Sequence, residues 1–303
     1  IQNPLGNDST PGQGNGLYGC LGQLYSLKLE NRNLKLILLV SGYMYSHGTY
    51  AFGFLARNSS RGEFVRSAVQ FIKDYGFDWL RVRPHTDMDI DTEFPTTAEE
   101  GNNLGDLVSS LRTAFNQLDG NSTSYQLSTA ISADKNDITY LAVRQMNETL
   151  DFWNIMAYNY SGSWEKQADN QANLFPVMLA RTMQSNNSYH GERLSIRSEL
   201  VGRFCSANDT GIPLYGHTFE NTDGIGKQYN SSVQRSSDSD RKQFFLTLPL
   251  RLGADIVENN TTVSSYSYDN STWELVSYDT PGIVELKAKY IMDQALAGRM
   301  YWE

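Results

Sequence analysis

The sequence predicts an α/β fold, a (β/α)8 barrel of parallel strands and covering helices, and three observations lead to this prediction. Continuous apolar runs, typical of buried parallel strands, alternate along the chain with segments of helical periodicity. This rhythm implies a parallel sheet, and its repetition favours a barrel. The length of 303 residues suits one large domain, and polar or aromatic residues follow nearly every predicted strand, where barrels place their active sites.

Each element has its own signal in the sequence. Residues 1–16 are rich in Gly, Asn and Pro, which is typical of a loop. The spacing of apolar residues predicts helices over 17–30, 63–75 and 104–118, the second of them ended by Gly76. Apolar runs predict strands over 34–42, 125–133, 150–160, 210–219 and 298–303, and the first of these is expected to be fully buried.

The most informative stretch is DMDIDTEFP, residues 87–95, in which Asp87, Asp89, Asp91 and Glu93 occupy alternate positions. In an extended strand, alternate side chains share a face, so the four carboxyl groups lie together. Crowded carboxylates raise one another's pKa, and a carboxyl kept protonated near neutral pH is a competent general acid. The pattern predicts a strand used for proton transfer. An exposed acidic edge strand or a loose calcium site is the alternative.

Residues 220–281 break the alternation of strand and helix. Short alternating strands at 264–268 and 274–278 lie on either side of Asp269 and Asn270. Two short strands around such a turn predict a small inserted antiparallel unit.

Charge and hydropathy restrict the partners. The net charge is −9 with no basic block, so nucleic acid is not an expected partner. The longest apolar run, Leu36–Val40, is far too short to cross a bilayer, so no membrane association is expected. The 18 Tyr outnumber the 13 Phe and 5 Trp, which suits binding of flat polar ligands such as sugars. A monomer is expected.

Several features favour a secreted glycoprotein. The chain opens on Ile1 with no charged and apolar leader, so we expect any signal peptide to have been removed or not included. Glycosylation sequons mark acceptor sites in secreted chains, and they occur at Asn7, Asn58, Asn121, Asn147, Asn159, Asn186, Asn208, Asn230, Asn259, Asn260 and Asn270. Chance occurrence in an Asn-, Ser- and Thr-rich chain is the alternative. Cys20 and Cys205 have no metal-site spacing, and whether they pair stays open.

Several segments together resemble the glycoside hydrolase family 18 chitinases, in particular the fungal endochitinase type. The matching stretches are YGCLGQLYSLKLENRNLKL (18–36), DIDTEFP (89–95), LDFWNIMAYNYSGSW (150–164), GIPLYGHTFENTDGIGKQYN (211–230), SYSYD, LVSYDTP and MYWE. They occur in the order of the family and span most of residues 18–302. Residues 176–207 and 231–262 match poorly.

The resemblance implies substrate-assisted, retaining cleavage of β-1,4-linked N-acetylglucosamine, for which no cofactor or metal is needed. It implies that Glu93 protonates the glycosidic oxygen, that Asp91 orients the acetamido group of the substrate, that Asp89 supports Asp91, and that Tyr158 binds the acetamido oxygen. The substrate-binding positions that it implies are Trp302, Met156, Asn159, Tyr43, Tyr215 and His217. Chitin or a chitooligosaccharide is the expected ligand.

The resemblance also implies a division into domains. Residues 1–217 would form the first part of the barrel, 218–281 the inserted α+β domain, and 282–303 the last strand of the barrel. Only six strands can be assigned, so we expect the barrel to be incomplete at the N-terminus of this chain.

The chain departs from the family pattern at several positions. The first Asp of the signature is Thr86, and residues 79–86 read as an insertion after Gly76-Phe77-Asp78. An alternative register would place Arg81, Arg83 and His85 at the acid positions, but the spacing from Pro95 to the next helix favours the register that keeps the acids. The family has Trp, Asp and Arg where this chain has Tyr43, Asn159 and His217, which predicts weaker turnover or altered binding.

Two other functions compete with the hydrolase. A chitinase-like lectin would bind chitooligosaccharide without cutting it, and the same departures favour it, although such lectins usually lose the acid at the position of Glu93. An unrelated two-carboxylate glycosidase would need an acid facing Glu93, for which Glu165 is the nearby candidate. The chain has no HExxH, GxSxG or phosphate-loop pattern.

Overall fold

The computed structural model describes residues 19–40, 58–82, 95, 97–118, 125–133, 138–175, 208–230 and 242–302. The chain divides into two compact units. The first consists of Ile1–Ala130 with Tyr140–Phe152, and the second of Ile131–Thr139 with Trp153–Glu303.

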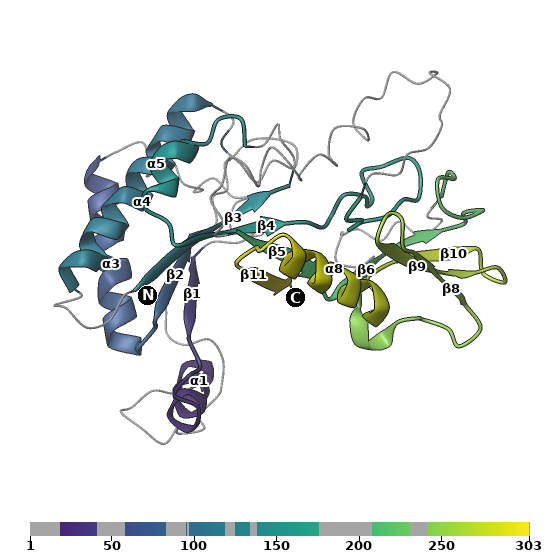
Figure 1. Cartoon of the computed structure of the whole chain (residues 1–303), viewed down its shortest axis with the longest axis horizontal. Coiled ribbons are helices and arrows are strands. Elements are labelled where there is room, and N and C mark those ends of the chain that lie inside the picture. The colour runs from purple at the N-terminus through teal and green to yellow at the C-terminus, as the bar shows by residue number, and fades with distance from the viewer. Residues whose placement is uncertain are drawn as a thin grey trace. The chain divides into compact units, whose positions relative to one another are not determined.

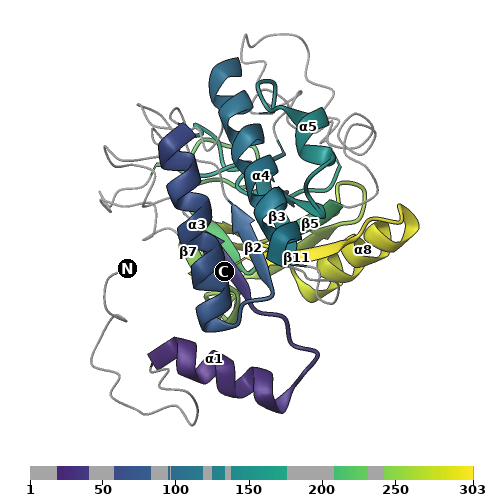
Figure 2. The same ribbon diagram turned by 90° about the vertical axis from the view of Figure 1, so that its left-hand side faces the viewer.

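In the first unit, three parallel strands alternate along the chain with helices (Figure 1). In chain order its elements are α1 (Gly19–Glu30), β1 (Ile37–Val40), α3 (Asn58–Tyr75), β2 (Trp79–Val82), α4 (Ala98–Leu118), β3 (Gln126–Ser132) and α5 (Val143–Asn147). Strands β1, β2 and β3 are neighbours in that order, with Ile37 opposite Trp79 and Trp79 opposite Gln126. Figure 2 shows α3 and α4 lying side by side.

The long helices follow the periodicity of their apolar residues. Helix α3 buries Val65, Ala68 and Ile72, which recur at the helical spacing of three and four. Helix α4 begins with a capping box, because Thr97 Oγ1 accepts from the main-chain N of Glu100 at 3.2 Å and the Glu100 carboxylate accepts from the N of Thr97 at 3.3 Å.

Gly76 ends α3 as predicted. Its φ of +68° lies in the left-handed region, which glycine adopts without steric cost.

Aspartate side chains tie down the amino ends of the strands in this unit. Asp78 accepts from the main-chain N of Leu36 at 2.9 Å and from Lys28 Nζ at 2.6 Å, so it joins α1 to the starts of β1 and β2. Asp151 accepts from Leu127 N at 2.6 Å and from Arg112 at 2.5 Å, which joins α4 to the start of β3. Charge-assisted hydrogen bonds of this kind are about twice as strong as neutral ones.

Two predictions for this unit need correction. The strand expected over 34–42 is only four residues long and is not fully buried, since Ile37 and Leu39 are 36% and 37% exposed. Within the described residues, β1 has one neighbouring strand, β2. The second correction concerns Trp79–Val82, which the sequence places in an insertion and the structure makes a strand between β1 and β3.

The second unit holds parallel strands next to a separate antiparallel sheet. Its elements are β4 (Phe152–Met156), β5 (Asn208–Pro213), β6 (Tyr215–Glu220), β7 (Lys242–Phe244), η3 (Phe245–Thr247), β8 (Asp255–Asn259), β9 (Ser264–Asp269), β10 (Glu274–Ser277), α8 (Pro281–Asp293) and β11 (Gly298–Trp302). Strand β5 lies between β4 and β11 and is parallel to both.

The strand predicted over 210–219 is two strands in different sheets. Strand β5 ends at Pro213, which has no N–H to continue a ladder, and Leu214 N donates instead to Trp302 O at 2.7 Å. The chain then enters β6, which pairs antiparallel with β7 and β10. Leu214 is therefore the point at which the chain changes sheets.

An antiparallel sheet occupies much of the region in which the sequence predicts an inserted unit. Its strand order is β7-β6-β10-β9-β8, and β9 and β10 form the expected hairpin around Asp269 and Asn270. Phe219, Leu275 and Ala168 form its buried core. The domain boundaries 1–217, 218–281 and 282–303 stay a prediction. Among the described residues, no helix combines the length and the hydrophobicity needed to cross a bilayer.

The close approach of α4 to a main-chain carbonyl gives a test of the packing. A Cβ on Gly101 would lie 1.7 Å from Tyr140 O, whereas a Cβ on Gly62 in α3 would meet nothing nearer than Arg66 at 3.7 Å. We expect Gly101→Ala to lower the free energy of unfolding by about 1–3 kcal/mol through overpacking. Gly62→Ala is expected to raise it by about 0.5–1 kcal/mol, because alanine favours helix. Urea unfolding measures both, and equal shifts would contradict the packing of α4.

Candidate active site

The predicted site residues that the structure describes lie in the second unit. Strand β4 ends at Met156, which is buried, and Tyr158 follows with 4% of its surface exposed. Asn159 comes next and has a φ of +59°, a left-handed conformation that Asn adopts more readily than most residues. The backbone therefore turns at Asn159, directly beyond the carboxyl end of a buried strand.

Asn159, Tyr215 and His217 form a hydrogen-bonded group. Tyr215 Oη donates to Asn159 Oδ1 at 2.6 Å, and His217 Nε2 lies 2.9 Å from the same oxygen. Tyr215 and His217 are two residues apart on β6 and so share a face. Tyr215 and His217 both bind Oδ1, so the side-chain oxygen of Asn159 is already hydrogen-bonded. The side-chain nitrogen of Asn159, Nδ2, carries the hydrogens that can be donated to a ligand.

The rings of Tyr158 and Trp164 pack against the two rings of this group. Ring centroids are 6.2 Å apart for Tyr158 and Tyr215, 5.7 Å for Tyr215 and His217, and 5.8 Å for His217 and Trp164, all edge to face. This is a favoured arrangement of aromatic rings. Trp164 is 39% exposed, whereas the other three rings are at least 95% buried. The cluster thus has a rigid buried part and one ring at the surface.

Gly211 makes room for the Tyr158 ring. A Cβ at this position of β5 would lie 2.6 Å from a Tyr158 ring carbon, 2.8 Å from Ile155 O and 3.1 Å from the methyl group of Met300. The Tyr158 ring therefore packs over the backbone of β5. A glycine inside a predicted strand is a known sign of such an approach, but the sequence did not single out Gly211.

Trp302 ends β11 close to this cluster along the backbone. It lies opposite Pro213 in the ladder, and its carbonyl oxygen accepts from Leu214 N, one residue before Tyr215. The structure thus brings the strand end that carries Trp302 to the start of β6.

Burial keeps one further hydroxyl of the region protonated. Desolvation raises the pKa of Tyr160 far above its usual value, and the charge of Asp279 and the nearby Tyr158 raise the pKa further. Tyr160 is therefore a neutral phenol throughout the working range of a protein.

Other predicted site residues lie outside the described residues. Glu93, Asp91 and Asp89 belong to this set, and so does Tyr43. Pro95 is described and is buried, in neither a helix nor a strand. The strand predicted over 87–95 and the roles of its acids stay predictions. Across the described ranges, no three His, Cys, Asp or Glu side chains are grouped to hold a metal ion.

A family model for the glycosyl hydrolases family 18 matches residues 5–303, so the chain belongs to that family. The chain is 34% identical to Chitinase 1 of Aphanocladium album and 33% identical to Endochitinase 1 of Metarhizium robertsii. Each alignment covers 98% of this chain and 67% of the relative. The family predicted from the sequence is confirmed.

Solved structures agree on the fold. The class V chitinase of Nicotiana tobaccum has a TM-score of 0.74 at 24% identity, over 92% of this chain and 78% of that one. Human YKL-39, described as a pseudo-chitinase with retained chitooligosaccharide binding properties, has a TM-score of 0.78 at 22% identity, over 93% and 77% of the two chains. The chain has the α/β barrel fold of this family, and the predicted fold class is confirmed.

The hydrogen bond between Tyr215 and Asn159 can be tested by stability. Tyr215→Phe keeps the ring and removes the donor, so we expect a loss of about 1 kcal/mol in the free energy of unfolding. Tyr301→Phe on β11 is the matched control, because Tyr301 is 43% exposed, and no change is expected there. Chemical denaturation measures both variants. Equal stability of the two would argue that the Tyr215 hydroxyl contributes nothing.

Proposed function

We propose that this protein is a secreted glycoside hydrolase that cleaves β-1,4-linked N-acetylglucosamine polymers, namely chitin and chitooligosaccharides. The observation that carries the proposal is the DIDTE stretch with Asp89, Asp91 and Glu93 inside a chain that belongs to family 18. The names of the relatives support the same substrate. Chitinases from two fungi match nearly the whole chain, and related solved chitinases were determined with bound N-acetylglucosamine oligomers.

In the proposed mechanism the substrate supplies the nucleophile. Glu93 gives its proton to the glycosidic oxygen as the bond from that oxygen to the anomeric carbon breaks. The acetamido carbonyl oxygen of the same sugar attacks the anomeric carbon, and Asp91 orients that group with Asp89 behind it. This attack closes a second ring, in which the acetamido oxygen is bonded to the anomeric carbon. Water then attacks the anomeric carbon and opens that ring, and the Glu93 carboxylate takes the proton from the water. Two inversions at one carbon give retention.

The described residues would hold the sugar for this step. The Tyr158 hydroxyl is the proposed donor to the acetamido oxygen, and its ring is fixed by packing on Gly211 and Tyr215. The Asn159 amide offers hydrogen-bond donors because its oxygen is occupied by Tyr215 and His217. Trp302 is the proposed platform under the sugar, since an aromatic face stacks on the apolar face of a pyranose.

The proton donor is tested by Glu93→Gln, which keeps the shape of the side chain and removes its acidity. We expect kcat on a chitooligosaccharide to fall about a hundredfold or more. The Kd should change by less than about tenfold, because the lost group acts in the transition state. Glu165→Gln is the matched control, since Glu165 is the acid that a two-carboxylate mechanism would use. A large loss with Glu165→Gln and none with Glu93→Gln would reverse the assignment.

A chitooligosaccharide-binding lectin is the second candidate. The observation that favours it is the hydrogen bond between Asn159 and His217, at two positions where the family resemblance implies Asp and Arg. The similarity to human YKL-39 is in keeping with it. Wild-type protein that binds chitotetraose tightly and leaves it intact after long incubation would favour the lectin over the hydrolase.

Secretion and N-glycosylation belong to the proposal as well. Exposed sequon asparagines at Asn230, Asn260 and Asn270 are open to a glycosyltransferase.

Expression in a secreting eukaryotic host tests this part of the proposal. We expect protein in the medium with a mass above the 34.2 kDa of the polypeptide, returning to that mass after endoglycosidase treatment. Asn270→Gln should remove one glycan. Secreted protein at the polypeptide mass before treatment would contradict glycosylation, and retention in the cells would contradict secretion.

A further inference from the structure

The segment from Ala157 to Phe175 leaves β4 and crosses the antiparallel sheet of the second unit. Ala168 N donates to Lys227 O at 2.9 Å, and Phe175 N donates to Thr262 O at 2.9 Å. The segment carries Asn159 and Trp164, so whatever fixes its path also fixes those two side chains.

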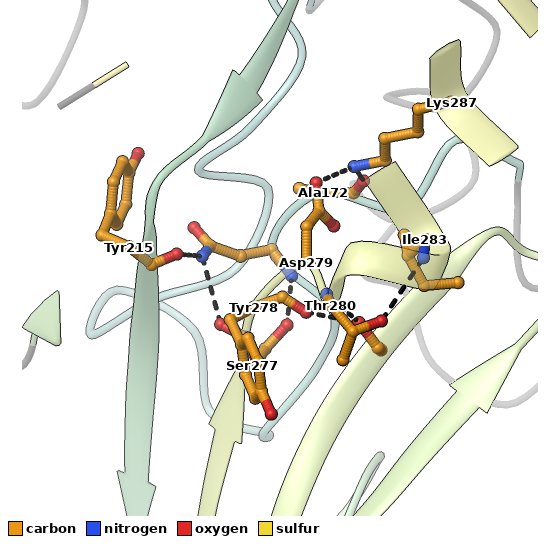
Figure 3. Close-up of polar contacts among 10 residues, drawn as sticks. Ala172, Tyr215, Ser277, Tyr278, Asp279, Thr280, Ile283 and Lys287 are labelled. Carbon is orange, nitrogen blue, oxygen red and sulfur yellow. Dashed lines mark hydrogen bonds and ion pairs between the residues drawn. The ribbon is translucent and has the colours of Figure 1, made fainter. Parts of the chain in front are cut away.

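Gln171, in this segment, is fully buried and hydrogen-bonded to two neighbouring strands. Its side chain is fully buried, and Nε2 donates to Tyr215 O at 2.7 Å and to Ser277 O at 3.1 Å. Its main-chain N donates to Ser277 Oγ at 3.0 Å. Both hydrogens of the amide are therefore used on carbonyl oxygens of neighbouring strands, β6 and β10. Figure 3 labels the two strand residues, Tyr215 and Ser277, whose carbonyl oxygens accept these hydrogen bonds.

The same residue is bonded to the turn that holds Asn159. Tyr160 N donates to Gln171 O at 2.9 Å, and Tyr160 follows Asn159 directly. Tyr215, whose carbonyl Gln171 binds, donates its hydroxyl hydrogen to Asn159. Gln171, Tyr215, Asn159 and Tyr160 thus form a closed ring of covalent and hydrogen bonds. A closed ring restricts each member more than separate contacts would.

A buried ion pair secures the next residue. Lys287 Nζ, on α8, donates to Ala172 O at 2.6 Å and to the carboxylate of Asp279, and both charged side chains are 2–3% exposed (Figure 3). Burial raises the pKa of Asp279, while the ammonium of Lys287 opposes that rise. Since removing either charge leaves the other buried alone, the pair holds Ala172 firmly in place.

We propose that Gln171 is a positioning residue for sugar binding, which sets the Asn159 amide against Tyr215 and His217. The proposal rests on the proposed function, because it takes Asn159 as a ligand contact. Gln171 itself is fully buried, so its effect passes through the residues that it binds, Tyr160 and Tyr215.

The first test replaces the amide with an apolar chain of similar length. Gln171→Met is expected to raise KM and Kd for chitotetraose about tenfold and to change kcat less than about threefold, because a misplaced binding group is lost from ground and transition states alike. Gln228→Met, an exposed glutamine of the same unit, is the control and should behave as wild type. A purely structural role would reduce the amount of active enzyme and leave KM unchanged, which would overturn the proposal.

The second test uses pH. Gln171→Glu places a carboxylate against two carbonyl oxygens, and burial raises the pKa of such a carboxyl above about 4.3. Once protonated it donates one hydrogen bond again. The ratio of variant to wild-type KM should therefore fall as the pH is lowered from about 7 to 5. The ratio for Gln171→Met should stay constant. A constant ratio for both variants would count against the hydrogen bonds as the cause.

The last test needs no sugar. In Gln171→Met, the Tyr160 amide should exchange its hydrogen faster, seen by mass spectrometry in the peptide 157–163. Unchanged exchange would overturn the anchoring role whatever the enzyme binds. If the variant does not fold, Ser277→Ala removes only the acceptor of Gln171 N and is expected to give smaller changes in exchange and KM, and wild-type values would overturn the proposal. If wild-type protein fails to bind chitotetraose, the proposed function is refuted. The hydrogen-exchange measurement still tests whether Gln171 anchors Tyr160.

Discussion

The buried pair of Lys287 and Asp279 is the constraint on which the second unit depends. Two opposite charges that are almost fully removed from water are tolerated only when each has its partner and further hydrogen bonds, and here Lys287 also donates to Ala172 O. Asp279 follows the end of β10, Lys287 lies on α8, and Ala172 lies on the segment that leaves β4. This pair therefore joins three parts of the unit, one of which, at Ala172, is more than 100 residues away from the other two in the sequence. Separating the end of β10 from α8 would leave two charges buried without compensation, and displacing Ala172 would cost Lys287 a hydrogen bond, which makes the arrangement cooperative.

The sequence predicted those elements whose local pattern agrees with their environment. Helix α4 was found because its apolar residues recur with helical spacing, and the β9–β10 hairpin because a turn separates two alternating strands. The prediction failed where tertiary contacts decide. Trp79–Val82 is a strand because Asp78 anchors its start beside β1, a contact that no local pattern contains. The break at Leu214 depends on a hydrogen bond to Trp302, about 90 positions away. Propensity is a weak guide when long-range pairing supplies most of the energy.

The candidate site likewise contains residues that the sequence pattern reveals and residues that only tertiary contacts reveal. Residues of marked chemical type, such as the carboxylates around Glu93, are evident from spacing alone. Tyr158, Asn159, Tyr215 and His217 were assigned by resemblance, and the structure brings these four together. Gln171 could not have been found in this way. It is a single polar residue in an irregular segment, and its importance lies in burial and in the two carbonyl oxygens that it binds.

The contact between Asn159 and His217 changes how the departures from the family pattern should be interpreted. Taken separately, each substitution replaces an Asp or Arg that the family resemblance implies. Since Asn159 and His217 share a hydrogen bond, the two substitutions lie at positions that contact each other, and the buried His217 ring keeps a polar partner. The pair is therefore internally consistent, which argues against random decay of the site. The side chain at position 159 differs in its chemistry. A neutral amide that donates hydrogen bonds stands where the family resemblance implies a carboxylate that accepts them. At this position a ligand oxygen is favoured and a ligand N–H is not. The altered pair therefore changes which groups of the sugar are bound, and it does not prevent the pocket from forming.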